Sequence, residues 1–211
     1  MAIILLIRHG ENDYTGKRLI GRQPGVGLNE KGRQQAVALA EWLADAPLKA
    51  IYSSPLERAV QTAQPLAHLK NLDVKINPAL IEVDYGECQG KTFKQLHRTK
   101  LWKAIHANPA EAVFPGGETL AGVQERIVRG LRELAATFEP ADVIACFSHA
   151  DVIRLAVAHF LCMPLGEFQR LSISTGSITV LHLNSDKARV THINLVSRLE
   201  WPVPTMRESK H

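Results

Sequence analysis

The feature that most constrains the fold of this chain is a series of short apolar runs that alternate with segments of helical periodicity. Residues 2–7 and 143–147 are almost wholly apolar, which is typical of strands buried on both faces of a sheet. Parallel strands need a crossover connection, and that connection is usually a helix. The alternation therefore predicts an α/β fold with a mostly parallel central sheet that helices cover on both faces.

Apolar periodicity and helix end signals place the other elements. The further predicted strands are residues 49–53, 74–76, 177–183 and 190–196. The predicted helices run from Asn29 to near Pro47, from residue 54 onward, over residues 117–138 and over residues 152–161. Two of them should begin with capping boxes, Ser54-Pro55-Leu56-Glu57 and Ser148-His149-Ala150-Asp151, and Pro65 should kink or end the helix that contains it.

Length and composition favour one globular domain. The chain has 211 residues with no charge run and no Ser/Gly-rich linker, so we expect one domain over residues 1–200 and a flexible tail over residues 201–211. Hydrophobic residues make up 45% and charged residues 22% of the sequence, which is ordinary for a soluble protein with a buried core.

The sequence does not predict a membrane or a nucleic-acid partner. The apolar run at residues 1–7 is too short for a signal peptide or a membrane span, and no later stretch reaches spanning length. Cys88, Cys146 and Cys162 match no zinc or redox motif, so we interpret them as reduced packing residues of a cytoplasmic protein. The net charge is +4 without a basic cluster, which fits a small anionic substrate better than a polyanion.

Polar side chains follow three predicted strands at the points where the strands end. His9 and His149 come shortly after apolar runs, and Arg58 lies in the first turn of the helix that follows residues 49–53. In open α/β sheets, ligands bind outside the carboxyl ends of the strands, often against helix N-termini that favour anions. We therefore expect these three side chains to converge on an anion site.

These residues can fill each role that cleavage of a phosphomonoester needs. A neutral His9 could attack phosphorus, while Arg8 and Arg58 could hold the non-bridging oxygens through bidentate contacts. His149 could donate to the same oxygens, and Glu82 with a raised pKa could protonate the leaving oxygen. No Asp/Glu/His cluster has the spacing of a metal site, so the chemistry is expected to need no metal.

Each of these residues taken alone has a plainer interpretation. A single histidine after a strand is more often a surface or structural residue, and Arg58 alone would be a solvated helix residue. Glu82 alone carries almost no information. The other histidines occupy no motif and are interpreted as structural or exposed, namely His68, His97, His106, His159, His182 and His192.

The order of the motifs resembles one known family. The stretch LIRHGEN at residues 6–12 resembles the Arg-His-Gly signature of the histidine phosphatase superfamily, which contains the phosphoglycerate mutases and related phosphatases. The other matching stretches are GLNEKG at residues 27–32, SSPLERAVQTA at 53–63, IEVDYG at 81–86, PGGET at 115–119 and SH at 148–149. The resemblance covers residues 3 to about 183.

The resemblance implies a fold and a set of roles. The fold would be the three-layer α/β/α sandwich of the phosphoglycerate mutase-like proteins, with no metal and no organic cofactor. The implied catalytic residues are His9 as phospho-acceptor, Arg8, Arg58 and His149 as the phosphate pocket, and Glu82 as proton donor. The expected substrate-binding residues are Asn12, Thr15, Arg18, Gly21 and Arg22.

Three positions depart from the family pattern. Ala150 stands where the family usually has glycine, which adds a methyl group near the phosphate. Thr15 stands where many members have an asparagine, although its hydroxyl could still donate. Arg22 stands where mutases commonly have an aromatic residue, and together with Arg18 it could recognise a second anionic group on the substrate.

A phosphatase acting on a small phosphorylated metabolite is the first functional hypothesis. A phosphoglycerate-type mutase is the second, and a non-catalytic member that binds phosphorylated ligands is the third. The segment Glu82-Val83-Asp84 is closer to the phosphatase branch than to the Glu-Arg pair of the glycolytic mutases, and the tail after Val196 resembles no mutase lid. Residues 13–27 and 86–116 are expected to be loops that line the pocket, and they carry no motif that names a substrate or an oligomeric state.

Overall fold

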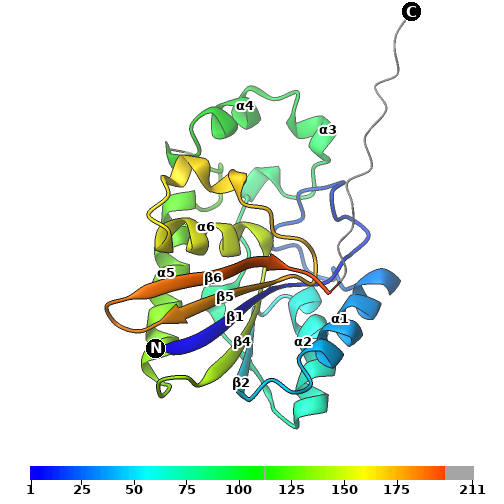
Figure 1. The fold of residues 1–211 in the computed structure, drawn as a ribbon. Coiled ribbons are helices and arrows are strands. Elements are labelled where there is room, and N and C mark those ends of the chain that lie inside the picture. The colour runs from blue at the N-terminus through cyan, green and yellow to red at the C-terminus, as the bar shows by residue number, and fades with distance from the viewer. Residues whose placement is uncertain (112, 198–211) are drawn as a thin grey trace, which may run out of the picture.

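The structure, a computed structural model, describes residues 1–111 and 113–197 and contains a six-stranded sheet in the order β3-β2-β4-β1-β5-β6 (Figure 1). The strands are β1 (Ala2–Arg8), β2 (Leu48–Ser53), β3 (Val74–Ile76), β4 (Val143–Ser148), β5 (Ile178–Leu183) and β6 (Ala188–Leu195). Every predicted strand is therefore present, with ends that lie within two residues of the prediction.

The sheet is mixed. Its mostly parallel character is confirmed by β1, β2 and β3, because β1 and β2 pair in parallel with β4 and β3 pairs in parallel with β2. The sequence did not indicate that β5 is antiparallel to β1 and that β6 is antiparallel to β5. Only residues 184–187 connect β5 to β6, which suffices for a hairpin and is far too short for a crossover.

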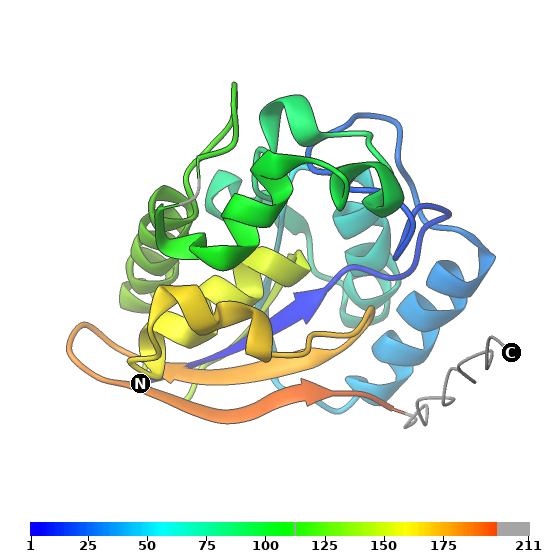
Figure 2. The same ribbon diagram turned by 90° about the horizontal axis from the view of Figure 1, so that it is seen from above.

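Helices cover both faces of the sheet, so the expected three-layer sandwich is present (Figures 1 and 2). The helices of these layers are α1 (Glu30–Trp42), α2 (Glu57–Lys70), α5 (Leu120–Ala136) and α6 (Ala150–Phe160). On β1, Leu5 and Ile7 belong to the core that α1 and α2 complete, whereas Ile4 and Leu6 belong to the core under α5 and α6. Successive side chains of a strand point to opposite faces, which is why an unbroken apolar run serves two cores.

Residues 86–116 are not the bare loop that we expected. They contain the helices α3 (Phe93–Leu96) and α4 (Lys100–Ala107), together with the 3-10 turns η2 (Gly86–Cys88) and η3 (Pro109–Glu111). Thr92 caps α3 in a capping box with Gln95, and Thr99 caps α4 through the Trp102 amide. Figure 1 shows α3 and α4 apart from the two helical layers. This segment therefore forms a separate helical cover.

The two predicted capping boxes are absent, because their serines bind elsewhere. The N-cap of α2 is Leu56 and the N-cap of α6 is His149, and neither has a side-chain cap hydrogen bond. The Ser148 hydroxyl instead donates to the Leu80 carbonyl (2.7 Å), and Ser54 Oγ lies 2.8 Å from His149 Nε2. The two strand-to-helix junctions therefore use their polar side chains for tertiary contacts.

Pro65 does not end its helix, because α2 continues to Lys70. Ala63, Leu66 and Ala67 of this helix are buried in the core between α1, α2 and the sheet. Packing of this kind outweighs the one backbone hydrogen bond that proline removes.

In residues 1–111 and 113–197, no helix combines the length and the apolar character that a membrane crossing requires. The tail that we expected at residues 201–211 lies outside the described residues.

Candidate active site

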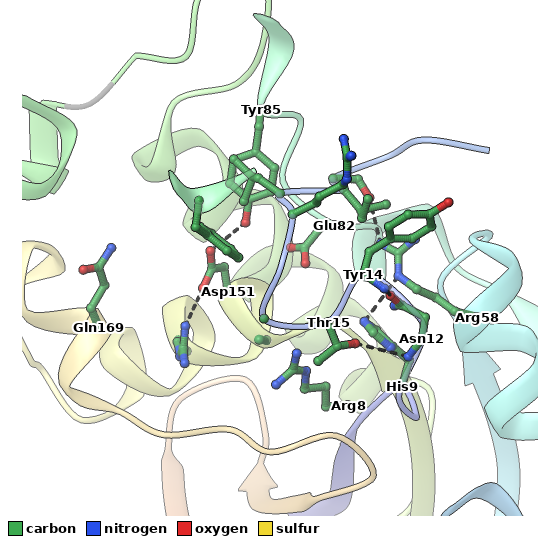
Figure 3. A pocket seen from close by; sticks show the side chains of 18 of the residues that line it. Arg8, His9, Asn12, Tyr14, Thr15, Arg58, Glu82, Tyr85, Asp151 and Gln169 are labelled. Carbon is green, nitrogen blue, oxygen red and sulfur yellow. Dashed lines mark hydrogen bonds and ion pairs between the residues drawn. The ribbon is translucent and has the colours of Figure 1, made fainter. Parts of the chain in front are cut away.

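The expected catalytic side chains meet where β1, β2 and β4 end. Arg8 is the last residue of β1 and pairs with Ser148 at the end of β4, and the His9 amide donates to the Ser148 carbonyl (3.0 Å). Arg58 lies in the first turn of α2, directly after β2. Arg8, His9, Arg58 and Glu82 surround a cavity of about 510 Å³ (Figure 3). His149 is fully buried and does not line the cavity itself, but its ring packs next to that of His9. We call Arg8, His9, Arg58 and Glu82, together with His149 beneath them, the floor of this cavity.

His9 is a neutral imidazole with a defined tautomer. Its Nδ1 lies 2.7 Å from the Gly10 carbonyl, and because a carbonyl only accepts, Nδ1 carries the proton. Nε2 is therefore unprotonated and accepts a 3.3 Å hydrogen bond from Arg58 Nε. Burial, together with the charges of Arg58 and Arg8, holds the pKa of His9 well below its usual value. His9 thus has the protonation state that a nucleophile requires.

Close backbone packing fixes the loop that carries His9. A Cβ on Gly10 would lie 2.7 Å from the Gly32 carbonyl in the first turn of α1, so only glycine fits there. The Gly10 amide also donates to Thr62 Oγ1 of α2 (2.9 Å). This packing explains physically why glycine follows the histidine in the Arg-His-Gly motif.

The hydrogen bonds of Ser54 indicate the tautomer of His149. Ser54 Oγ accepts a hydrogen bond from the Leu56 amide (3.3 Å) and lies 2.8 Å from His149 Nε2. If the hydroxyl proton goes to Nε2, then Nδ1 carries the ring proton and is free to donate. His149 Nδ1 has no partner among the residues that the structure describes, and its ring centroid lies 5.1 Å from that of His9. Burial, followed by the nearby charge of Arg58, holds the pKa of His149 well below its usual value.

The two floor arginines keep unused donors. Arg58 is buried, and its Nη2 donates to the Gly21 carbonyl (2.7 Å), whereas its Nη1 has no acceptor in the described part of the chain. Arg8 Nη1 donates to the Ile173 carbonyl (2.7 Å), and its Nε likewise lacks an acceptor among those residues. Buried polar groups are normally hydrogen-bonded, so these donors indicate a site for an anion.

Glu82 is a buried carboxyl group beside these cations. Its Oε1 accepts a hydrogen bond from the Val83 amide (2.9 Å). Burial and the negative charge of Asp151 raise the pKa of Glu82 to about 7, although Arg58 and Arg8 oppose the shift. A carboxyl group with this pKa can give and take a proton near neutral pH.

Asp151 also lines the cavity, and its position shortly after His149 was the one sequence feature that pointed to this location. Its Oδ2 accepts from the Tyr85 hydroxyl (2.6 Å) and its Oδ1 accepts from Arg154 Nη1 (2.8 Å), as Figure 3 shows for Tyr85. These two hydrogen bonds, one of them from a guanidinium, hold the Asp151 side chain in a fixed orientation. The sequence signal that could have found it is the acidic residue in the first turn of α6, which faces the same end of the sheet as His149.

Four of the five expected substrate-binding residues line the cavity, namely Asn12, Thr15, Arg18 and Gly21. The Asn12 amide donates to Thr15 Oγ1 (3.1 Å), and Asn12 Oδ1 accepts from the Tyr14 amide (3.0 Å), so Thr15 helps to close a local turn. Gly21 has a φ of +56°, a conformation that suits glycine, and its carbonyl holds Arg58. Ala150 also lines the cavity.

Arg22 lies behind the cavity and is not one of its lining residues. Its Nη2 donates to Glu118 Oε2 (2.7 Å) and its Nε donates to the Glu82 carbonyl (2.8 Å). This geometry favours a role in holding the Glu82 segment over the expected contact with a second anionic group. The acidic partner comes from a position 96 residues away, so the sequence could not reveal the pair.

The outer part of the cavity is lined by residues from the two segments that were expected to line it, 13–27 and 86–116. We call Tyr14, Arg18, Phe93, Trp102 and His106 the outer wall. Of these, only Arg18 was expected as an individual residue, and His106 was interpreted as structural or exposed, although it lines the cavity. Tyr14, Phe93 and Trp102 stand in no motif, because their common location depends on how residues 14–18 and α3 and α4 fold together.

In residues 1–111 and 113–197, no three His, Cys, Asp or Glu side chains are grouped so that they could hold a metal ion. The positive charge beside His9 comes from arginines.

Comparison with protein families identifies the chain. Residues 4–196 match the family model of the histidine phosphatase superfamily (branch 1). Phosphoserine phosphatase 1 of Hydrogenobacter thermophilus is 29% identical over 204 residues, which cover 94% of this chain and 95% of that protein. A 2,3-bisphosphoglycerate-dependent phosphoglycerate mutase of Thermoplasma acidophilum is 34% identical over 182 residues, which cover 86% and 87% of the two chains.

Solved structures agree with this assignment. A mycobacterial glucosyl-3-phosphoglycerate phosphatase in complex with VO3 has a TM-score of 0.82 and 30% identity, with 92% of this chain and 99% of that chain covered. A phosphoserine phosphatase of Entamoeba histolytica in complex with 3-phosphoglyceric acid has a TM-score of 0.83 and 26% identity, with 93% and 98% covered. This chain belongs to branch 1 of the histidine phosphatase superfamily.

Proposed function

We propose that this protein hydrolyses phosphomonoesters of small metabolites through a phosphorylated His9. The observation that carries the proposal is the unprotonated Nε2 of His9, which lies beside two arginines with unused donors and shares a cavity with a carboxyl group whose pKa is about 7. The names of the relatives support hydrolysis of small phosphorylated substrates, since three of the four compared above are named as phosphatases.

The proposed first step forms phosphohistidine. Nε2 of His9 attacks phosphorus while the bond from phosphorus to the ester oxygen breaks. Arg8 and Arg58 stabilise the charge on the non-bridging oxygens, and the Nδ1–H of His149 adds a neutral donor. Glu82 gives its proton to the leaving alkoxide, so the alcohol departs neutral and Glu82 becomes a carboxylate.

The proposed second step returns the enzyme to its starting state. The Glu82 carboxylate takes a proton from water as the water oxygen attacks phosphorus, and the bond from phosphorus to Nε2 breaks. Inorganic phosphate leaves, and both His9 and Glu82 recover their first protonation states. The pKa of Glu82 near 7 suits both directions of this proton transfer.

The direct test of this mechanism is to trap the phosphoenzyme, which should be labile to acid. Rapid quench with a ³²P-labelled monoester should trap a phosphoenzyme that survives alkali, and His9→Ala should abolish both the label and turnover. His97→Ala is the matched control, because His97 does not line the cavity and should keep the label. Label that persists in His9→Ala would falsify the assignment of the nucleophile.

Mutase activity is the second candidate, because one relative is named a phosphoglycerate mutase. We favour hydrolysis because Val83, next to Glu82, is a fully buried apolar residue and offers no charge to a reorienting bisphosphate. Of the tail after Val196, only Ser197 lies within the described residues. Incubation with 3-phosphoglycerate and catalytic 2,3-bisphosphoglycerate should release phosphate faster than it forms 2-phosphoglycerate, and the reverse ranking would favour the mutase.

The proposal includes a small-molecule substrate and a cytoplasmic location. A cavity of about 510 Å³ fits one metabolite. Cys88, Cys146 and Cys162 are all free thiols, two of them buried, as expected for a reducing compartment. Fractionation of the native cells, with phosphatase activity as the readout, tests the location.

A further inference from the structure

We propose that the outer wall is a binding subsite for a ring, so that the preferred substrates are phosphomonoesters whose alcohol part carries a ring with an apolar face. This inference rests on the proposed function, because it concerns the part of the substrate that leaves. The outer wall consists of Tyr14, Arg18, Phe93, Trp102 and His106, as defined above.

The size of the cavity requires a sizeable alcohol part. Pockets of roughly 300–1,000 Å³ hold whole drug-sized ligands, and a cavity of about 510 Å³ lies within this range. A phosphoryl group at the floor fills only the end beside His9. The remaining space is bounded by the outer wall and by further residues that include the polar Asp151, Arg154 and Gln169. The outer wall is the part of this lining that offers aromatic rings to the alcohol part of the substrate.

Three aromatic side chains of the outer wall, Phe93, Trp102 and His106, pack against one another. The ring centroids of Trp102 and His106 lie 4.5 Å apart, and those of Phe93 and Trp102 lie 6.3 Å apart. His106 Nδ1 lies 2.9 Å from the Trp102 carbonyl, which fixes the plane of the imidazole. Aromatic rings in such clusters bind other rings through offset or edge contacts and remove apolar area from water.

Backbone hydrogen bonds hold the two halves of the outer wall together. The Phe93 amide donates to the Lys17 carbonyl (3.2 Å) and the Leu19 amide donates to the Lys91 carbonyl (3.0 Å). Arg18 Nη1 adds a bond to the Gly90 carbonyl (2.9 Å). The subsite is thus largely formed before the ligand arrives, which reduces the entropy lost on binding.

The charged side chains around the subsite disfavour binding of a ring that carries a positive charge. The two carboxyl groups that line the cavity are Glu82 and Asp151, and Asp151 is already paired with Arg154. Arg18 forms no ion pair with the carboxylates of residues 1–111 and 113–197, so its charge is available to the ligand. A neutral or anionic ring fits this surface, and a ring bearing an ammonium group does not.

Two esters with the same leaving-group chemistry isolate the contribution of the ring. Propyl phosphate and 3-phenylpropyl phosphate both release a primary alcohol, and titration calorimetry on His9→Ala measures their Kd values without turnover. We expect the phenyl ester to bind on the order of tenfold tighter, the size of effect that a few apolar contacts give. The ammonium analogue, 3-aminopropyl phosphate, should bind no better than propyl phosphate.

Substitutions in the His9→Ala background show which residues make the contact. Phe93→Ala and His106→Ala should each remove most of the preference, and Phe93→Leu should restore part of it. His97→Ala is the matched control: its ring packs against the same cluster, 6.3 Å from Trp102, but it does not line the cavity, so the preference should remain.

Equal Kd values for the two esters, or an equal loss of preference in His97→Ala and His106→Ala, would overturn the subsite. A separate measurement tests the proposed function itself. If that function is wrong, the wild-type protein forms no phosphoenzyme with either ester. Thermal melts of each variant show whether a lost preference comes from unfolding.

Discussion

The floor and the outer wall of the cavity are built in different ways. The floor residues are buried or half-buried. All of them except Glu82 stand at or directly after a strand end or in the first turn of a helix, where the sheet fixes their positions, and Glu82 lies in the segment between Leu80 and Gly86. The outer wall comes from residues 14–18 and the short helices α3 and α4, and Tyr14, Arg18 and His106 are exposed. A reaction that is common to a family requires catalytic residues in fixed positions, as in the floor. Loops and short helices such as those of the outer wall can differ between members, so the same floor can serve substrates with different alcohol parts.

The largest effect that tests this comparison should come from Glu82→Gln. The variant keeps the shape but cannot supply a proton, so alkyl phosphates should lose about 10²–10⁴-fold in kcat. p-Nitrophenyl phosphate, whose leaving group needs no proton, should lose far less. Steady-state kinetics on both esters measures the difference. Equal losses on both would move the acid role to another cavity residue, with Asp151 the first candidate.

The second largest loss of activity should come from Arg58→Lys in the floor, and Arg18→Lys in the outer wall is the variant with which it is compared. Both changes keep the charge and remove the planar fork. At the floor, the lost contact to phosphoryl oxygens should lower kcat/KM about 10²–10³-fold, because Arg58 is buried and its donors have no substitute. In the outer wall the loss should stay below about tenfold and appear in KM. Similar losses in the two variants would contradict the division into floor and wall.

A smaller effect is expected for Asp151→Asn, which tests the electrostatics between the two regions. The anion of Asp151 contributes to the raised pKa of Glu82, and catalysis of alkyl ester cleavage needs Glu82 protonated. In the wild type, kcat/KM for propyl phosphate should therefore fall as the pH rises through about 7. In Asp151→Asn the fall should begin at lower pH, with a loss on the order of several-fold at pH 7.5.

Asp84→Asn is the matched control for this experiment, because Asp84 lies outside the cavity and accepts from the Gly86 amide (2.9 Å). Its pH profile should match the wild type. The second ionisation of the substrate affects all three proteins equally, so only the difference between profiles is interpreted. An unchanged profile in Asp151→Asn would show that burial alone sets the pKa of Glu82.

The smallest effect is expected from chelation. The arginines of the floor supply the positive charge that a metal provides in other phosphatases, so prolonged EDTA treatment should leave kcat within about twofold of the untreated enzyme. Inductively coupled plasma analysis of the dialysed protein supplies the metal content. Loss of turnover that Mg²⁺ or Zn²⁺ restores would mean that the floor is incomplete as described.

Local patterns in the sequence were enough to predict the parallel part of the sheet and to predict that the floor residues converge. An apolar run followed by a polar residue locates a strand end, and parallel strands bring their ends together, so His9 and His149 were expected to meet. Local patterns failed at Ser54 and Ser148, which match capping boxes but bind His149 and Leu80. A hydroxyl group satisfies either partner, and only the tertiary contacts select one.

The sequence by itself determined the α/β class, the order of most elements and the identity of the floor, because these depend on short-range periodicity and on motifs. Only the tertiary structure decided that Arg22 binds Glu118, that Asp151 lies beside Glu82 in one cavity, and that His106 joins the outer wall. Each of these facts depends on contacts between residues far apart in the chain. Their geometry follows from packing of whole elements, and no local pattern of residues records it.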